Sequence, residues 1–197
     1  LRLTRSLVPD LRAVLAPASV AVVGVSEDTA TWGGSALHSL LDGGYVGVVY
    51  PIDPRGGTCL GLPVYPDLAH LPATPDLAVL AVPGAQVVGA LEECGRRGVR
   101  AAVVLGQATD EERCAIAAAA MAHRLTVLGP HCRGLVSSEA RLQVTDPRPA
   151  PALAGGLSLI SQSGDTGPAV VDICARRGIG INTFVSVGDE AVVSVFD

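Results

Sequence analysis

The sequence predicts an α/β fold built on a parallel β-sheet. Short apolar runs alternate with helical stretches along most of the chain. Hydrophobic residues make up 49% of the 197 residues, but aromatic residues only 3%. This balance is typical of buried parallel strands covered by Ala-rich helices. Strands that alternate with helices imply right-handed crossovers within one sheet, as in Rossmann-like folds.

The first elements follow from the apolar runs and from the residues that interrupt them. A short helix is expected at residues 10–15, ended by Pro17, and the helix that begins near Trp32 ends at Gly43-Gly44. Pro51 is expected to stop the second strand, and Asp110 to cap the last helix of this part. Strands are expected at residues 19–24, 46–50, 76–82, 100–105 and 125–128, with later helices at about 85–97 and 110–123.

A second unit is expected after a proline-rich segment. Three prolines lie within residues 147–151, which is typical of a linker. We therefore predict a first domain at residues 1–145, a linker at 146–155 and the start of a second domain at 156–197. In the second unit a strand is expected at residues 157–160, a helix at 166–177 and a strand at 181–187. Two strands do not close a domain, so we expect the sequence to be part of a longer chain.

Composition argues against several classes of protein. The net charge is −5 and the Arg residues are scattered, so we expect no nucleic-acid partner. No apolar run reaches the length of about 18 residues that a membrane helix needs, and no signal-peptide pattern opens the sequence. The five cysteines are odd in number and none forms C-x-x-C, which predicts buried thiols in a reducing cytoplasm and no metal site.

The loop after the first strand is the first candidate ligand site. In open α/β sheets ligands bind at the carboxyl ends of the strands. Gly24, Val25, Ser26 and Gly33 lie between the first strand and the first long helix, where glycine lets a phosphate approach the backbone. Ser26 replaces the second glycine of G-x-G-x-x-G, which weakens the case for NAD. The alternative is an ordinary strand-to-helix turn.

Three further strand ends carry candidate residues. After the second strand, Asp53-Pro54-Arg55 offers an acid for a ribose hydroxyl or a cation for a phosphate, although a solvated turn has the same residues. Val82-Pro83 follows the third strand and could pack against an adenine edge. His131 follows the fifth strand, and a lone histidine there is more often a structural hydrogen-bonding residue.

The loop at residues 161–164 is a candidate phosphate site in the second unit. Ser161, Ser163 and Gly164 lie between a strand and a helix, where hydroxyl groups and helix N–H groups favour an anion. Asp165 follows directly, and its carboxylate would repel a phosphate at close range.

Six stretches together resemble the alpha part of succinyl-CoA synthetase and its relatives, the NDP-forming acyl-CoA synthetases. These relatives include ADP-forming acetyl-CoA synthetases and the CoA-binding part of some bacterial protein acetyltransferases. The matching stretches are SVAVVGVS (19–26), YPIDPRGG (50–57), GLPVY (61–65), DLAVLAVP (76–83), LGPHCRG (128–134) and ISQSG (160–164). Each stretch is weak alone, but their common order covers nearly the whole chain.

The resemblance implies a CoA-binding Rossmann-like domain followed by the start of a flavodoxin-like domain. The loop at Gly24–Ser26 with Gly33 would hold the CoA phosphates, Arg55 would supply a basic residue, and Val82-Pro83 would line the adenine pocket. Residues 161–164 would help to hold the phosphate of a phosphohistidine located beyond this chain, so no catalytic residue is expected here.

The same resemblance implies the reaction and partners of the full-length protein. It would join a carboxylic acid to the CoA thiol through an acyl phosphate and the phosphohistidine. ATP, Mg²⁺ and a nucleotide-grasp domain or beta subunit would be required, and this chain alone would be catalytically incomplete. Assembly into a homo-oligomer stays open.

Three departures from the family pattern keep an alternative open. His131 replaces the usual Asn of G-P-N-C-x-G, and Asp165 replaces a small or hydroxylated residue. Val192 and Val193 replace an acidic run. These changes affect the phosphoryl chemistry more than CoA binding. They favour, as the alternative, a CoA- or acyl-CoA-sensing regulatory module of an acetyltransferase, or a catalytically degenerate homologue.

Overall fold

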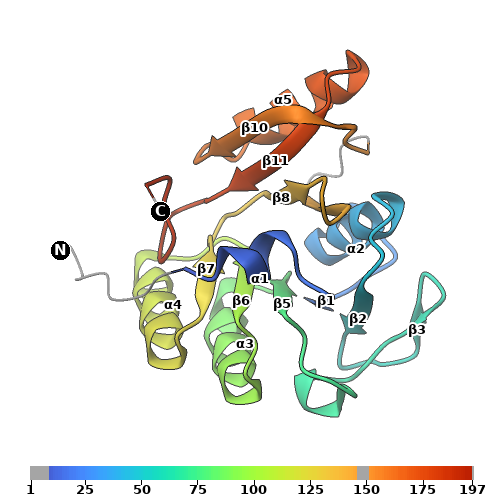
Figure 1. Ribbon diagram of the computed structural model, residues 1–197. Helices are drawn as coiled ribbons and strands as arrows, with labels where there is room; N and C mark the ends of the chain where they lie inside the picture. The colour runs from blue at the N-terminus through green and yellow to red at the C-terminus, as the bar shows by residue number, and fades with distance from the viewer. Residues whose placement is uncertain (1–8, 146–150, 197) are drawn as a thin grey trace.

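The structure is a computed structural model that describes residues 9–145 and 151–196. It confirms the predicted α/β class. Five parallel strands form one sheet in the order β2-β1-β5-β6-β7 (Figure 1). Its strands are β1 (Ser19–Val23), β2 (Val48–Ile52), β5 (Leu77–Leu80), β6 (Ala101–Val104) and β7 (Thr126–Leu128). The helices that accompany it are α1 (Leu11–Leu15), α2 (Trp32–Asp42), α3 (Gly84–Arg97) and α4 (Asp110–His123).

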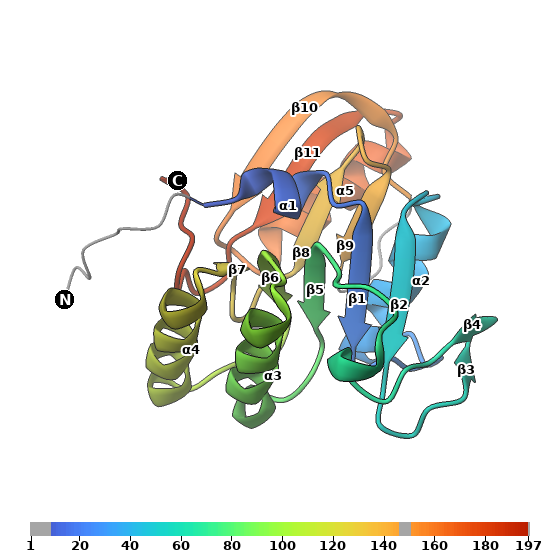
Figure 2. The ribbon, with the colours of Figure 1, turned by 60° about the horizontal axis from the view of Figure 1, so that its bottom comes forward.

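The two faces of this sheet bury different helices. Successive side chains of a strand point to opposite faces. Accordingly, Val20 and Val22 of β1 pack with α2 and with the second sheet, whereas Ala21 packs with α3 and α4. Figure 2 shows α3 and α4 side by side on one face and α2 on the other. Burial on both faces explains why the strands are continuous apolar runs without alternation.

A second, four-stranded sheet has the order β10-β11-β8-β9. It comprises β8 (Gly134–Ser137), β9 (Leu142–Thr145), β10 (Ala154–Ser161) and β11 (Ile181–Ser186), and α5 (Thr166–Arg176) packs on it around Phe184. Strands β10 and β11 are parallel, whereas β8 is antiparallel to both β11 and β9. The hairpin of β8 and β9 was not predicted. The hairpin precedes the predicted linker, but its strand β8 hydrogen-bonds to β11, which follows the linker.

A small extension follows β2. Strands β3 (Thr58–Cys59) and β4 (Leu62–Pro63) form a two-residue hairpin, and the 3-10 helix η1 (Leu68–His70) leads back to the sheet. Tyr65 donates its N–H to the carbonyl of Pro51 at 2.9 Å, so this extension is fixed to the end of β2.

Three predicted boundaries were wrong. Strand β2 begins at Val48 and continues through Pro51, because an edge strand tolerates a residue without an N–H. Thr109, and not Asp110, caps α4: its hydroxyl accepts from the N–H of Glu112 at 3.2 Å, and the Glu112 carboxylate accepts from the Thr109 N–H at 2.8 Å. Strand β10 begins at Ala154, earlier than the predicted residue 157, and residues 146–150 of the predicted linker lie outside the described part.

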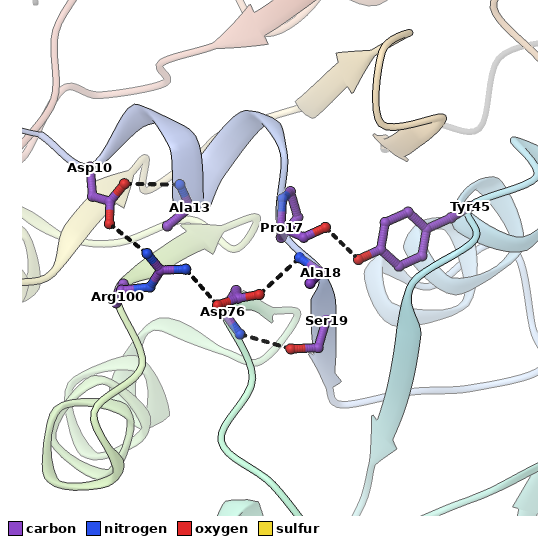
Figure 3. A network of polar contacts seen from close by, with 8 residues as sticks. All are labelled: Asp10, Ala13, Pro17, Ala18, Ser19, Tyr45, Asp76 and Arg100. Atoms are coloured by element: carbon purple, nitrogen blue, oxygen red, sulfur yellow. Dashed lines mark hydrogen bonds and ion pairs between the residues drawn. The ribbon is translucent and has the colours of Figure 1, made fainter.

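At the amino end of the parallel sheet, Arg100 joins three elements (Figure 3). Its guanidinium donates to Asp10 at 3.2 Å and to Asp76 at 2.5 Å. The other carboxylate oxygen of Asp76 accepts from the N–H of Ala18 at 2.8 Å. Burial raises the pKa of Asp76, but the hydrogen bonds from Arg100 and Ala18 outweigh this effect and leave the pKa below its ordinary value.

Tyr45 also hydrogen-bonds to the backbone at this end of the sheet, next to β1. Its hydroxyl donates to the carbonyl of Pro17 at 2.9 Å (Figure 3). Burial, with a contribution from the charge of Asp76, raises the pKa of Tyr45 to about 12. The phenol therefore stays protonated and serves as a hydrogen-bond donor.

Within residues 9–145 and 151–196, every helix is too short or too polar to span a lipid bilayer.

Candidate functional site

A groove of about 400 Å³ lies at the carboxyl ends of β1, β2 and β5. The chain passes from β1 to β2 on one side and later returns to β5 on the other, so β1 and β5 flank the switch in strand order. This is where open α/β sheets bind ligands. The groove brings together five residues predicted from three separate loops: Gly24, Asp53, Pro54, Val82 and Pro83.

Two glycines allow the loop after β1 to pack tightly. Gly24 has φ +85°, and a Cβ there would lie 2.6 Å from the carbonyl oxygen of Ala81. A Cβ on Gly33 would lie 1.9 Å from the carbonyl oxygen of Gly24. Thr31 caps α2, because its hydroxyl accepts from the N–H of Gly34 at 3.1 Å. The start of α2 and the loop are therefore in backbone-to-backbone contact, which a larger residue would prevent.

The remaining predicted residues of this loop have structural contacts. Val25 is buried in the core, and its N–H lies 3.3 Å from the carbonyl oxygen of Ile52. The hydroxyl of Ser26 accepts from the N–H of Asp28 at 3.1 Å. Val25 therefore presents no side chain to the groove, and Ser26 stabilises the turn toward α2.

Asp53 and Arg55 form a two-pronged ion pair at the edge of the groove. The guanidinium Nε and Nη2 atoms lie 2.7 and 3.2 Å from the two carboxylate oxygens. The hydrogen bond from Arg55 lowers the pKa of Asp53. The Asp53 side chain is 15% exposed, whereas that of Arg55 is 80% exposed. Asp53 thus lines the groove, while Arg55 extends into solvent beside it.

The opposite wall of the groove was missed in the sequence. It includes Gln86, Ala90 and Glu93 of α3, and Pro66 to Leu68 at the start of η1. The three α3 residues are spaced four and three apart, so they share one helix face. This spacing is visible in the sequence and could have predicted that α3 forms a wall of the groove. The contribution of residues 66–68 depends on how the β3–β4 extension folds back.

His131 lies away from this groove, in a second polar cluster. Its backbone has φ +56°, a left-handed conformation that Asn, Asp and His adopt more readily than most residues. Its N–H donates to the carbonyl of Gly106 at 2.8 Å, and its Nδ1 lies 3.7 Å from Asp189. The backbone conformation at position 131 therefore suits His as well as the Asn of the family pattern.

The second cluster also contains the predicted phosphate loop. A Cβ on Gly164 would lie 3.3 Å from Nε of Arg133 and 4.0 Å from Nε2 of His131. Ser161 donates to the carbonyl of Ser163 at 3.1 Å. The structure therefore brings His131 to this loop, and it adds Arg133, which was not among the predicted site residues.

Serine and cysteine side chains fix the loops of this second cluster. The hydroxyl of Ser163 donates to the hydroxyl of Thr166 at 2.9 Å and accepts from its N–H at 3.3 Å. The thiol of Cys132 donates to the carbonyl of Ser186 at 2.9 Å. Burial raises the pKa of Cys132 to about 12, so this thiol anchors the loop and is not a nucleophile at neutral pH.

Among residues 9–145 and 151–196, no group of His, Cys, Asp and Glu side chains has the arrangement of a metal site.

Comparison with known families identifies the fold unit that carries the groove. Residues 18–138 match the family model of the CoA binding domain. The chain belongs to the CoA-binding domain family. In this CoA-binding domain the match extends from the start of β1 to the β8–β9 hairpin, so it includes both the groove and the His131 loop. Residues 154–197 match a second model, the succinyl-CoA ligase like flavodoxin domain, which begins with β10.

Two similar proteins are named as ADP-forming acetate–CoA ligases. The chain is 33% identical to an ADP-forming acetate–CoA ligase of Archaeoglobus fulgidus over 92% of its length. It is also 33% identical to the alpha subunit of the corresponding ligase of Pyrococcus furiosus over 95% of its length. The chain spans only 27% and 43%, respectively, of these two relatives.

Solved structures agree with this assignment. A dinucleotide-forming acetyl-coenzyme A synthetase from Ca. Korarchaeum cryptofilum, in complex with phosphate and ADP, superposes with a TM-score of 0.90 at 36% identity. The match covers 94% of this chain and 41% of that one. An ATP citrate lyase of Methanothrix soehngenii has the same fold, with a TM-score of 0.64 at 19% identity.

Proposed function

We propose that this chain is the CoA-binding portion of an ADP-forming acyl-CoA synthetase. The observation that carries the proposal is the groove at the β1–β5 switch point, in a chain that belongs to the CoA-binding domain family. A groove of about 400 Å³ that combines apolar walls with a small set of polar side chains, here Asp53, Asp67, Gln86 and Glu93, is typical of a cofactor site.

Each part of the groove suits one part of CoA. Val82, Pro83 and Pro54 offer apolar surface to the adenine ring. Gly24 lines the groove without a side chain, and Gly33 lets the start of α2 pack directly on the Gly24 backbone, which would bring the N-terminal end of α2 close to the CoA phosphates. Arg55 would exchange part of its pairing with Asp53 for a CoA phosphate, which a planar guanidinium binds through two hydrogen bonds.

In the full-length protein, the reaction would join a carboxylic acid to CoA through an acyl phosphate and a phosphohistidine. This chain would hold CoA, and the loop at residues 161–164 would face the phosphoryl group. A nucleotide-grasp domain or beta subunit, ATP and Mg²⁺ would complete the enzyme. The names of the relatives support this proposal, as does the division into a CoA-binding domain and a flavodoxin-like domain.

We also propose a cytoplasmic location. All five cysteines are free thiols in the structure, four of them buried, which suits a reducing compartment.

Titration calorimetry of the chain with CoA, and separately with NAD, tests the ligand. We expect CoA to bind with one-to-one stoichiometry and NAD to bind far more weakly. The reverse preference would reject both the CoA proposal and the alternative below.

A regulatory CoA sensor is the second candidate. Its specific support is the pair of charged or titratable residues, His131 and Asp165, at the predicted phosphate loop. The longer protein, incubated with ATP, Mg²⁺, CoA and a panel of carboxylic acids, distinguishes the two. Acyl-CoA formation supports the synthetase, whereas CoA binding without any product supports the sensor.

A further inference from the structure

The backbone of Arg133 is fixed by its own N–H and by the residues before and after it. Its N–H donates to the hydroxyl of Ser186 at 3.0 Å, at the end of β11. On one side, Cys132 is buried and bonded to the same residue of β11. On the other side, Gly134 has φ +96°, and a Cβ there would lie 1.8 Å from the carbonyl oxygen of Val144. The start of the Arg133 side chain therefore has little freedom.

The guanidinium of Arg133 lies beside the loop between β10 and α5. Its Nε is 3.3 Å from the Cβ position of Gly164, so even an alanine there would crowd it. The side chain of Arg133 is only 25% exposed. A largely buried cation next to the loop is thus a fixed feature of the cluster.

Asp165, in contrast to Arg133, is exposed to solvent. Its side chain is fully exposed, and one carboxylate oxygen lies 3.8 Å from Nη2 of Arg133. An aspartate at the start of a helix usually accepts a hydrogen bond from the helix backbone, but Asp165 makes no such bond to α5, and Ser163 accepts from Thr166 in its place. Capping therefore does not explain this carboxylate.

The contact between Arg133 and Asp165 is weak enough for another anion to replace Asp165. At 3.8 Å it exceeds hydrogen-bonding distance, and an ion pair with one exposed partner contributes little to stability. A phosphoryl group carries more charge than a carboxylate and can accept two parallel hydrogen bonds from a guanidinium. A phosphoryl group at the loop would therefore compete effectively with Asp165 for Arg133.

We propose that Arg133 is a phosphate-binding residue of the 161–164 loop and that Asp165 is an exchangeable counter-ion which weakens phosphate binding there. The proposal rests on the proposed function, which assigns a phosphoryl group to this loop. It adds a cation from the neighbouring β7–β8 loop, and it gives Asp165 a competitive role. Upon phosphate binding, Arg133 stays in place and the exposed carboxylate moves away.

Binding of inorganic phosphate to the 197-residue chain, measured by ³¹P NMR titration at constant ionic strength, tests this proposal. Asp165→Ser places a small hydroxylated residue on the fully exposed side chain position. We expect about fivefold tighter phosphate binding, because a competing charge is removed. Arg133→Met should weaken binding about tenfold, because a charge-assisted contact is lost. Arg133→Lys should recover part of that loss, whereas a purely structural role would not depend on charge.

Arg176→Met is the matched control. Arg176 pairs with Asp172 at 2.8 Å near the other end of α5, so the variant removes an Arg–Asp pair remote from the loop. Phosphate affinity should not change. If Asp165→Ser leaves the affinity unchanged, or if Arg133→Met binds phosphate as the parent does, the proposal is overturned. CoA calorimetry on the same samples separates this result from a failure of the proposed function, because the CoA groove shares no residue with this pair.

Discussion

The two ends of the parallel sheet use their polar groups in opposite ways. At the amino end, Arg100, Asp76 and Asp10 bind one another, and Tyr45 bonds to the backbone beside them (Figure 3). At the carboxyl end, the loops and α3 leave a groove whose walls combine apolar side chains with Asp53, Asp67, Gln86 and Glu93. The first arrangement stabilises the fold, whereas the second leaves the space that we propose for CoA. Substitutions at the two ends should therefore separate stability from binding.

Gly33→Ala should have the largest effect on the carboxyl end. The new Cβ would overlap the carbonyl oxygen of Gly24, so the loop or α2 must move. Overpacking of this kind lowers the free energy of unfolding by about 1–3 kcal/mol. We expect CoA affinity, measured by calorimetry, to fall about 100-fold. Gly89→Ala is the control, because no atom lies within 4 Å of its Cβ position on α3. Wild-type CoA affinity in the Gly33 variant would show that the loop contact is not needed.

Arg100→Met should disrupt the hydrogen-bond network at the amino end of the sheet without affecting the groove. It removes the hydrogen bonds to Asp10 and Asp76 and leaves the Asp76 carboxylate with fewer partners. We expect the free energy of unfolding to fall by about 1–2 kcal/mol, which lowers Tm by about 2–8 °C. Thermal denaturation measures this effect, and CoA affinity should stay unchanged. A loss of affinity without loss of stability would contradict the separation of the two ends.

Arg55→Met should have a smaller effect, confined to binding. The side chain is mostly exposed, so stability should change little. Loss of a charge-assisted contact to a CoA phosphate should weaken binding about tenfold. Calorimetry with CoA and with dephospho-CoA shows whether the lost contact involves the 3′-phosphate. Arg176→Met again serves as the exposed Arg–Asp control, and an equal effect in both variants would point to general electrostatics.

The pH dependence of stability should also reveal the amino-end network, with the smallest effect. The pKa of Asp76 is lowered in the folded chain, so its contribution is present above the unfolded pKa of about 4 and is lost as pH falls through the folded pKa. The difference in Tm between wild type and Arg100→Met should therefore narrow below about pH 4. A difference that stays constant down to pH 2 would show that Asp76 does not depend on this arginine.

The sequence predicted the parallel sheet and the groove loops well, because both depend on local signals. Apolar runs identify buried strands, and loops at the carboxyl ends of such strands must converge. The β8–β9 hairpin was missed because its two strands are only four residues each and their partner, β11, lies across the predicted linker. Arg133 was not among the predicted site residues, because the role that we propose for it depends on a contact with Asp165, 32 positions along the chain, that no local pattern encodes.

Hydrogen exchange with and without CoA tests the central claim most directly, since it measures both ends of the sheet in one experiment. The account predicts that CoA slows exchange in the carboxyl-end loops at residues 24–34, 53–56 and 82–86. Residues 10–19 and 100–101 at the amino end should exchange at unchanged rates. Slower exchange at the amino end, or no slowing in the three loops at a saturating CoA concentration, would contradict the assignment of the groove as the CoA site.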